Sequence, residues 1–198
     1  MINLIKNKFF VVILAVFFLL SSFVIGYKEA NAADPSLVGQ WSAVSNLPVK
    51  ATHTALLPNG KVITWPSVEG DNPYIWDPVS NTIEPAPKAG YNIFCAGFSL
   101  TADGKLFVPG GHIVTPIGLP HASFYDYTTN SWTRVADMNN KRWYPTVTTL
   151  TNGDLLVISG TIAKDVYNKI PQVYQISTNT WRTLSNASLQ TSLYPFMY

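Results

Sequence analysis

The stretch Phe98-Ser-Leu-Thr-Ala-Asp-Gly104-Lys-Leu-Phe-Val-Pro-Gly-Gly111 decides the fold. It contains an apolar run, an Asp-Gly turn and a second apolar run, and Asn-Gly or Asp-Gly between short apolar runs strongly predicts a β-hairpin. The pattern occurs twice more, as Thr54-Ala-Leu-Leu-Pro-Asn-Gly60 and as Thr148-Thr-Leu-Thr-Asn-Gly153, each followed by an apolar run. We therefore expect three repeats, each opening with a hairpin.

The second half of each repeat keeps a fixed register. Three sets of positions recur every 49 residues: Trp76, Tyr125 and Tyr174; Asn81, Asn130 and Asn179; and Ile83, Trp132 and Trp181. Four short strands in a repeat of about 50 residues are typical of a propeller blade, and of the kelch repeat in particular. Gly110-Gly111 matches the kelch glycine doublet, whereas Pro66-Ser67 and Ser159-Gly160 replace it in the other repeats. A β-sandwich would not impose such a register.

The sequence thus predicts an all-β, kelch-type β-propeller with about three four-stranded blades. We place the blades at about 40–90, 91–140 and 141–187, and the start of a fourth at 188–198, where Leu193-Tyr-Pro195 echoes Trp143-Tyr-Pro145. Propellers close with four to eight blades. We therefore expect an incomplete propeller, the N-terminal part of a longer protein.

Residues 1–32 have the pattern of a signal peptide. Lys6 and Lys8 precede an apolar run from Phe9 to Ile25, and Ala30-Asn-Ala32 supplies a small-residue cleavage site. The alternative is an uncleaved anchor, because the run approaches spanning length. We expect cleavage before Ala33, a secreted or cell-surface protein, and no membrane attachment afterwards.

Charge and cysteine content narrow the possible functions. From Ala33 onward ten Lys and Arg face eight Asp and two Glu, so the net charge is zero and no basic cluster suits a nucleic acid. Cys95 is the sole cysteine, which excludes an internal disulfide. By residue type alone we interpret it as a small buried hydrophobe.

Repeat arithmetic pairs Cys95 with Tyr144. Each lies nine residues before a turn glycine, Gly104 or Gly153, and they are 49 residues apart. First strands of propeller blades line the central axis, so equivalent positions on neighbouring blades lie close together. Ala51 holds the position in the first repeat and Tyr194 falls near the next one. The pair is either incidental packing or a functional site.

Two segments favour the functional site. Phe94-Cys-Ala-Gly97 and Arg142-Trp-Tyr-Pro-Thr146 resemble the segments of the galactose oxidase and glyoxal oxidase family that supply a cysteine and a tyrosine joined by a thioether. The resemblance extends through Leu106–His112 and Ser131–Met138. It implies a seven-bladed propeller and a copper radical oxidase, which oxidises primary alcohols, aldehydes or carbohydrates with dioxygen to give hydrogen peroxide.

The resemblance also implies roles for individual residues. Cys95 and Tyr144 would form the thioether-linked radical cofactor, and Tyr144 would bind copper. Ile162 stands where the family has a tryptophan that covers the thioether, and an aliphatic side chain cannot stack in the same way. The family's other copper ligands, a tyrosine and two histidines, come from later blades and a C-terminal domain. We therefore expect an incomplete copper site and a chain that is inactive by itself.

The remaining polar residues indicate no second catalytic centre. His53, His112 and His121 show no ligand spacing, no nucleotide-binding or hydrolase motif occurs, and Asp77 and Asp126 fit turns. Two alternatives to the oxidase remain. One is a non-catalytic kelch module that binds glycans or a protein partner at the cell surface. The other is a decayed reading frame whose product does not fold stably.

Overall fold

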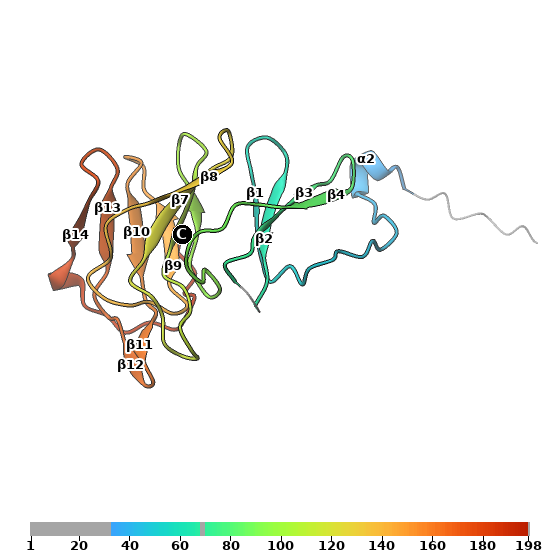
Figure 1. The fold of residues 1–198 in the computed structure, drawn as a ribbon. Coiled ribbons are helices and arrows are strands. Elements are labelled where there is room, and N and C mark those ends of the chain that lie inside the picture. Colours follow the sequence, from blue (N-terminus) through green and yellow to red (C-terminus); the bar gives the residue numbers. More distant parts are fainter. Residues whose placement is uncertain (1–32, 68–69, 198) are drawn as a thin grey trace, which may run out of the picture. The chain divides into compact units, whose positions relative to one another are not determined.

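The computed structural model describes residues 33–67 and 70–197 (Figure 1). The chain divides after Ser45 into two units. In the first, Asp34 caps the one-turn helix α2 (Pro35–Val38) by accepting the Ser36 N–H through its carboxylate at 2.9 Å. No helix in the described part of the chain could cross a bilayer. The predicted signal peptide lies outside the described residues.

The second unit is built from antiparallel sheets. Three of them have four strands, and a separate hairpin accompanies the third. The first sheet contains β1 (His53–Leu56), β2 (Val62–Trp65), β3 (Tyr74–Asp77) and β4 (Thr82–Pro85). The second contains β5 (Ser99–Leu100), β6 (Leu106–Pro109), β7 (Ala122–Asp126) and β8 (Ser131–Arg134). The third contains β9 (Thr146–Thr149), β10 (Leu155–Ile158), β13 (Gln172–Gln175) and β14 (Thr180–Thr183).

Glycine and asparagine close the hairpins where the backbone needs positive φ. Gly60, Gly104 and Gly153 end the first hairpins at φ of 80°, 80° and 89°. The second hairpins turn at Asn81, Asn130 and Asn179, with φ of 54°, 50° and 55°. Asparagine tolerates this region better than most residues, because its short side chain forms local hydrogen bonds. The turn residues of the sequence thus explain where each strand ends.

The repeat aromatics hold these asparagines. Tyr125 donates its hydroxyl to the Asn130 side chain at 2.7 Å, and Trp76 donates its indole N–H to Asn81 at 3.2 Å. Tyr174 makes the same bond to Asn179. Asp77 and Asp126 accept backbone N–H groups two residues on, each at 2.9 Å, so their predicted role as turn formers is confirmed.

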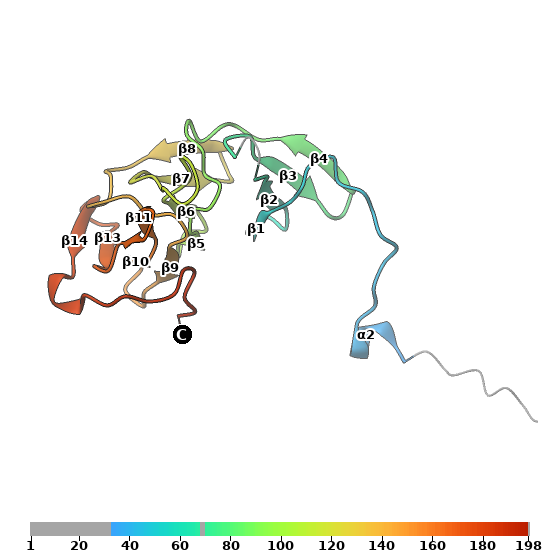
Figure 2. The same cartoon turned by 90° about the horizontal axis from the view of Figure 1, so that it is seen from below.

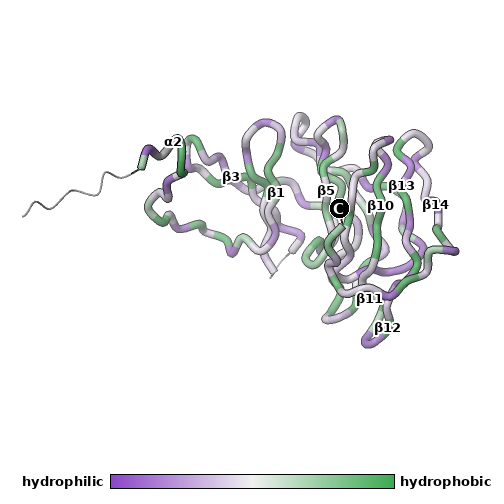
Figure 3. Tube along the Cα trace, turned by 180° about the vertical axis from the view of Figure 1, so that it is seen from behind, coloured by the Kyte–Doolittle hydropathy of each residue, from purple (hydrophilic) through white to green (hydrophobic). Residues whose placement is uncertain are grey.

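The sheets pack face to face. All four residues of β6 are buried. Leu106 and Val108 join a core with the first sheet, and Phe107 joins a core with the third. Alternate residues of a strand point to opposite faces, so the middle sheet is covered on both. β10 alternates buried and half-buried residues, and Figure 3 shows its hydrophobic character.

One tryptophan in the second sheet and one in the third form a hydrogen bond to the segment that follows the preceding sheet. Trp132 of β8 donates its indole N–H to the carbonyl of Pro87 at 2.9 Å, and Trp181 of β14 donates to Ala136 at 2.8 Å. Seen from below (Figure 2), β1, β5 and β9 lie toward one common side, and β4, β8 and β14 lie on the outer side. The expected all-β class and the propeller arrangement of four-stranded sheets are confirmed.

One hairpin was not anticipated from the repeats. β11 (Thr161–Ala163) and β12 (Val166–Tyr167) form a two-stranded sheet between β10 and β13. Asp165 turns it at a φ of 61°. The hairpin projects at one end of the third sheet (Figure 1). The kelch assignment and the blade boundaries stay predictions.

Candidate functional site

The site begins with three repeat-related backbone positions. Cys95, Tyr144 and Tyr194 all have positive φ, at 63°, 65° and 46°. Tyr144 donates its N–H to the Cys95 carbonyl at 2.9 Å, and Tyr194 donates to the Tyr144 carbonyl at 3.0 Å. Residues other than glycine adopt positive φ at a cost, which the surrounding contacts must offset. This backbone ladder joins the openings of successive sheets, as the repeat arithmetic predicts.

The Cys95 thiol and the Tyr144 phenol lie together. Cys95 is 0% exposed, and burial raises the pKa of its thiol to about 12, although hydrogen bonding with Tyr144 and Trp143 opposes that rise. Burial and the neighbouring Cys95 raise the pKa of Tyr144 to about 12 as well. Both groups are therefore neutral at pH 7. The arrangement disfavours thiolate chemistry, which needs a lowered thiol pKa.

Trp143 is a residue that the sequence reasoning missed. Its indole stacks on the Tyr144 ring, with centroids 3.6 Å apart and planes 11° apart. Its N–H donates to Nδ1 of His112 at 3.0 Å. Its backbone pairs with Thr161, at 3.0 and 2.9 Å for the two N–H···O bonds. Its position in Arg-Trp-Tyr-Pro, directly before Tyr144, was the feature of the sequence that could have indicated a role for Trp143 in the site.

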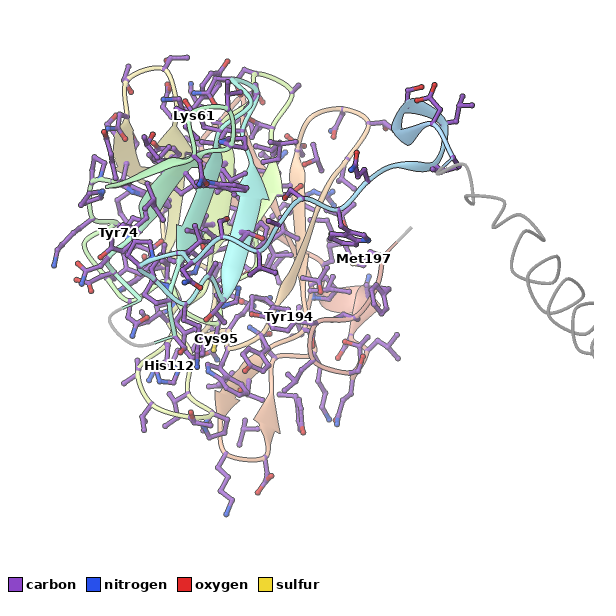
Figure 4. The ribbon with its side chains drawn as sticks, turned by 90° about the vertical axis from the view of Figure 1, so that its right-hand side faces the viewer. Lys61, Tyr74, Cys95, His112, Tyr194 and Met197 are labelled. Atoms are coloured by element: carbon purple, nitrogen blue, oxygen red, sulfur yellow. The ribbon has the colours of Figure 1, made fainter. Side chains whose placement is uncertain are left out.

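Tyr194 contributes a further ring. It stacks on Tyr144 with centroids 4.5 Å apart and planes 23° apart, and its hydroxyl donates to the Ala96 carbonyl at 3.1 Å. Figure 4 shows Cys95, His112 and Tyr194 at the same end of the strands, away from Lys61. The site therefore combines residues that open the second, third and next repeats.

Arg142 anchors the loops behind the site. Its buried guanidinium donates to the carbonyls of Ser159 and Ile170, both at 2.7 Å, and desolvation lowers its pKa to about 10. A Cβ at Gly110 would lie 2.7 Å from the Arg142 carbonyl oxygen, and one at Gly160 would lie 2.8 Å from the Arg142 Cβ. Glycine occurs at these positions because two backbones approach closely there.

The three histidines occupy separate places. His53 accepts the Cys95 N–H through Nε2 at 3.1 Å, and burial lowers its pKa to about 4. His112 accepts from Trp143, and burial also lowers its pKa. His121 contacts Arg134 and Asp137. Among the described residues no three His, Cys, Asp or Glu side chains gather as a metal site.

Ile162, predicted to cover the thioether, follows Thr161 in β11 and is half-buried. Its covering role stays a prediction.

A hollow lined by Thr101, Asp103 and Asn152 lies at the hairpin turns, at the other end of the strands from Cys95. It shares no residue with the Cys95 cluster, so we locate the candidate site at the cluster.

Comparisons with known proteins point to relatives of one kind. The chain is 29% identical over 176 residues to the galactose oxidase of Gibberella zeae, a match that covers 82% of this chain and 25% of the relative. It also resembles the structure of a fungal alcohol oxidase of the AA5 family in complex with copper. That match has a TM-score of 0.59 and 25% identity, and covers 73% of this chain and 32% of the other. No family model matches the sequence.

Sequence and fold together indicate a class: the chain is similar to galactose oxidase-like proteins. The particular relatives are the galactose oxidase of Gibberella zeae and the copper-bound fungal alcohol oxidase. The chain spans about a quarter of the length of the curated relatives that it matches, which are 25% covered.

Copper fits the described residues at one ligand position. The Tyr144 phenol oxygen is a suitable donor for copper(II) once it has lost its proton. Nε2 of His53 and Nδ1 of His112 are occupied by protein hydrogen bonds. One oxygen donor alone does not make a copper site, so further ligands are required besides Tyr144.

Proposed function

We propose that this chain carries the Cys95–Tyr144 part of a secreted copper radical oxidase. The enzyme oxidises primary alcohols or aldehydes, carbohydrates among them, and reduces dioxygen to hydrogen peroxide. One observation supports this most: a buried thiol lies against a stacked phenol at repeat-related positions of a galactose oxidase-like chain. Incidental packing would not require positive φ at both residues.

Cys95 and Tyr144 would become one redox group. The Sγ–carbon bond forms as the S–H and an ortho C–H of the Tyr144 ring are lost, and two electrons and two protons pass to dioxygen, which leaves as hydrogen peroxide. A sulfur substituent makes the phenol easier to oxidise. Copper, when bound, would supply a one-electron acceptor beside the Tyr144 oxygen.

The protein environment would prepare this group. A Tyr144 pKa of about 12 means that metal binding must displace the phenol proton. Burial of Cys95 keeps its thiol protonated and away from competing disulfide chemistry. Substrate oxidation would remove two electrons and two protons from a primary alcohol or aldehyde hydrate, and dioxygen would accept them as peroxide.

Mass spectrometry tests the proposal. We expect the full chain, incubated in air with copper(II) and with imidazole to supply the remaining ligands, to lose two hydrogen atoms and to yield one fused peptide containing Cys95 and Tyr144. Cys95→Ser and Tyr144→Phe should abolish the fusion. The matched variant Tyr194→Phe keeps its ring and should retain it. Two separate peptides from the wild-type protein would refute the proposal.

Peroxide assays test the incomplete ligand set. With Tyr144 as the ligand identified in the described residues, we expect no turnover from this chain alone. Steady peroxide production without an added subunit would contradict that expectation. Glycan binding that persists in a Cys95→Ser/Tyr144→Phe double variant, together with no copper uptake by the wild type, would favour the non-catalytic kelch module.

A further inference from the structure

We propose that Trp143, fixed by His112, covers the Tyr144 phenol and acts as a positioning residue of the redox centre. This inference rests on the proposed function and goes beyond it. It assigns the aromatic cover to the residue directly before the tyrosine, whereas the resemblance points to the position of Ile162, which carries no ring.

The stacking geometry carries the first step. Trp143 lies 3.6 Å and Tyr194 4.5 Å from Tyr144, and both rings are nearly parallel to the phenol. Two rings on one face of the phenol at these distances would touch each other. No Trp143–Tyr194 contact occurs among the aromatic pairs of the described residues. The two rings therefore take opposite faces and enclose Tyr144 between them.

His112 carries the second step. It accepts the Trp143 indole N–H at 3.0 Å, and its ring lies 5.3 Å from that of Phe94. Phe94 and Trp143 are 49 residues apart and directly precede Cys95 and Tyr144. His112 thus contacts both residues that lead into the redox pair. Trp143 is only 8% exposed, so its N–H needs this acceptor.

The chemical role follows from the electronic character of the stack. The face of an indole is electron-rich and attracts positive charge. Oxidation draws electron density from the phenol, so an indole at 3.6 Å would stabilise the oxidised ring and exclude water from one face. An acceptor on the indole N–H increases the electron density of the indole further. We therefore expect Trp143 and His112 to prolong the life of the Tyr144 radical.

Proton NMR of copper-free protein with labelled tyrosine rings tests the cover itself. The Tyr144 resonance, assigned by its loss in Tyr144→Phe, should lie upfield because of the indole ring current. Trp143→Leu should remove that shift and Trp143→Phe should keep part of it. His112→Leu should alter it, and the matched variant His121→Leu should not. An ordinary wild-type shift, or a shift unchanged in Trp143→Leu, would overturn the inference.

Electron paramagnetic resonance of protein that is oxidised after its copper has been removed tests the chemical role, because a radical bound to copper(II) would be spin-coupled to the metal. We expect the Tyr144 radical signal to decay about threefold to tenfold faster in Trp143→Leu, the change that losing one aromatic stack allows. Trp143→Phe should fall between. Faster decay in Ile162→Ala, with Trp143→Leu unchanged, would assign the cover to Ile162 and reject Trp143. A wild type that forms no thioether would refute the proposed function, while the NMR result would still decide whether Trp143 covers Tyr144.

Discussion

His53 makes the stability of the site depend on pH. Burial lowers its pKa from 6.5 to about 4, because the buried ring disfavours the charged form, and the neutral Nε2 accepts the Cys95 N–H. The unfolded chain then binds more protons than the folded chain between these values. The contribution is complete above pH 6.5 and is lost as the pH falls toward 4.

Denaturant unfolding at a series of pH values checks this. We expect the free energy of unfolding to fall by up to about 2–3 kcal/mol between pH 6.5 and 4. His53→Gln keeps an acceptor for the Cys95 N–H without a titrating ring, so its stability should vary much less over this range. Parallel pH profiles for the two proteins would contradict the assignment.

Arg142 stabilises through hydrogen bonds to carbonyls. Arg142→Leu would leave the Ser159 and Ile170 carbonyls without their donor, and we expect a loss of about 2–4 kcal/mol. Arg182 of β14 is exposed, so Arg182→Leu should stay within about 0.5 kcal/mol of the wild type. Equal losses from the two variants in urea unfolding would show that Arg142 has no special role.

At the level of elements, substitutions at two glycines distinguish the cost of a steric clash from the cost of an unfavourable backbone conformation. A Cβ at Gly118 would collide with the backbone of Arg142 and Trp143, whereas one at Gly153 meets nothing within 4 Å, although its φ is 89°. We expect Gly153→Ala to cost about 1 kcal/mol through φ alone. Gly118→Ala should cost more and should also disturb the Tyr144 ring resonance. A smaller cost at Gly118 would argue against the close approach.

The strands and the pairing of Cys95 with Tyr144 were predictable from local signals, whereas the cover of the Tyr144 ring was not. Asn-Gly and Asp-Gly turns and the 49-residue register locate the hairpins, and the same register pairs Cys95 with Tyr144. The cover by Trp143 depends on a hydrogen bond to His112, which lies 31 residues away in the sequence. The 49-residue register does not predict this contact. The β11–β12 hairpin also escapes the register, because it is inserted between two repeat strands.

At the scale of the whole molecule, Trp132 and Trp181 couple neighbouring sheets. Repeat proteins gain stability from interfaces between neighbours, so weakening both bonds should reduce the cooperativity of unfolding. We expect Trp132→Phe/Trp181→Phe to lose about 2 kcal/mol, about 1 for each bond, and to unfold over a broader denaturant range. Trp76→Phe, whose indole bond to Asn81 stays within one sheet, should lower the midpoint without broadening. Equal transition widths would contradict the coupling.

Amide protons of the middle sheet should exchange with solvent more slowly than those of the other sheets. β6 is buried on both faces, while β10 alternates between buried and half-buried residues. Amide protons of β6 can exchange with solvent only when both sheet interfaces open, so their exchange should report global unfolding. Amides of β2 and β10 need the loss of one interface and should exchange sooner. In a hydrogen–deuterium exchange experiment, β2 and β10 should therefore take up deuterium before β6, and Phe107 should be the last residue to do so.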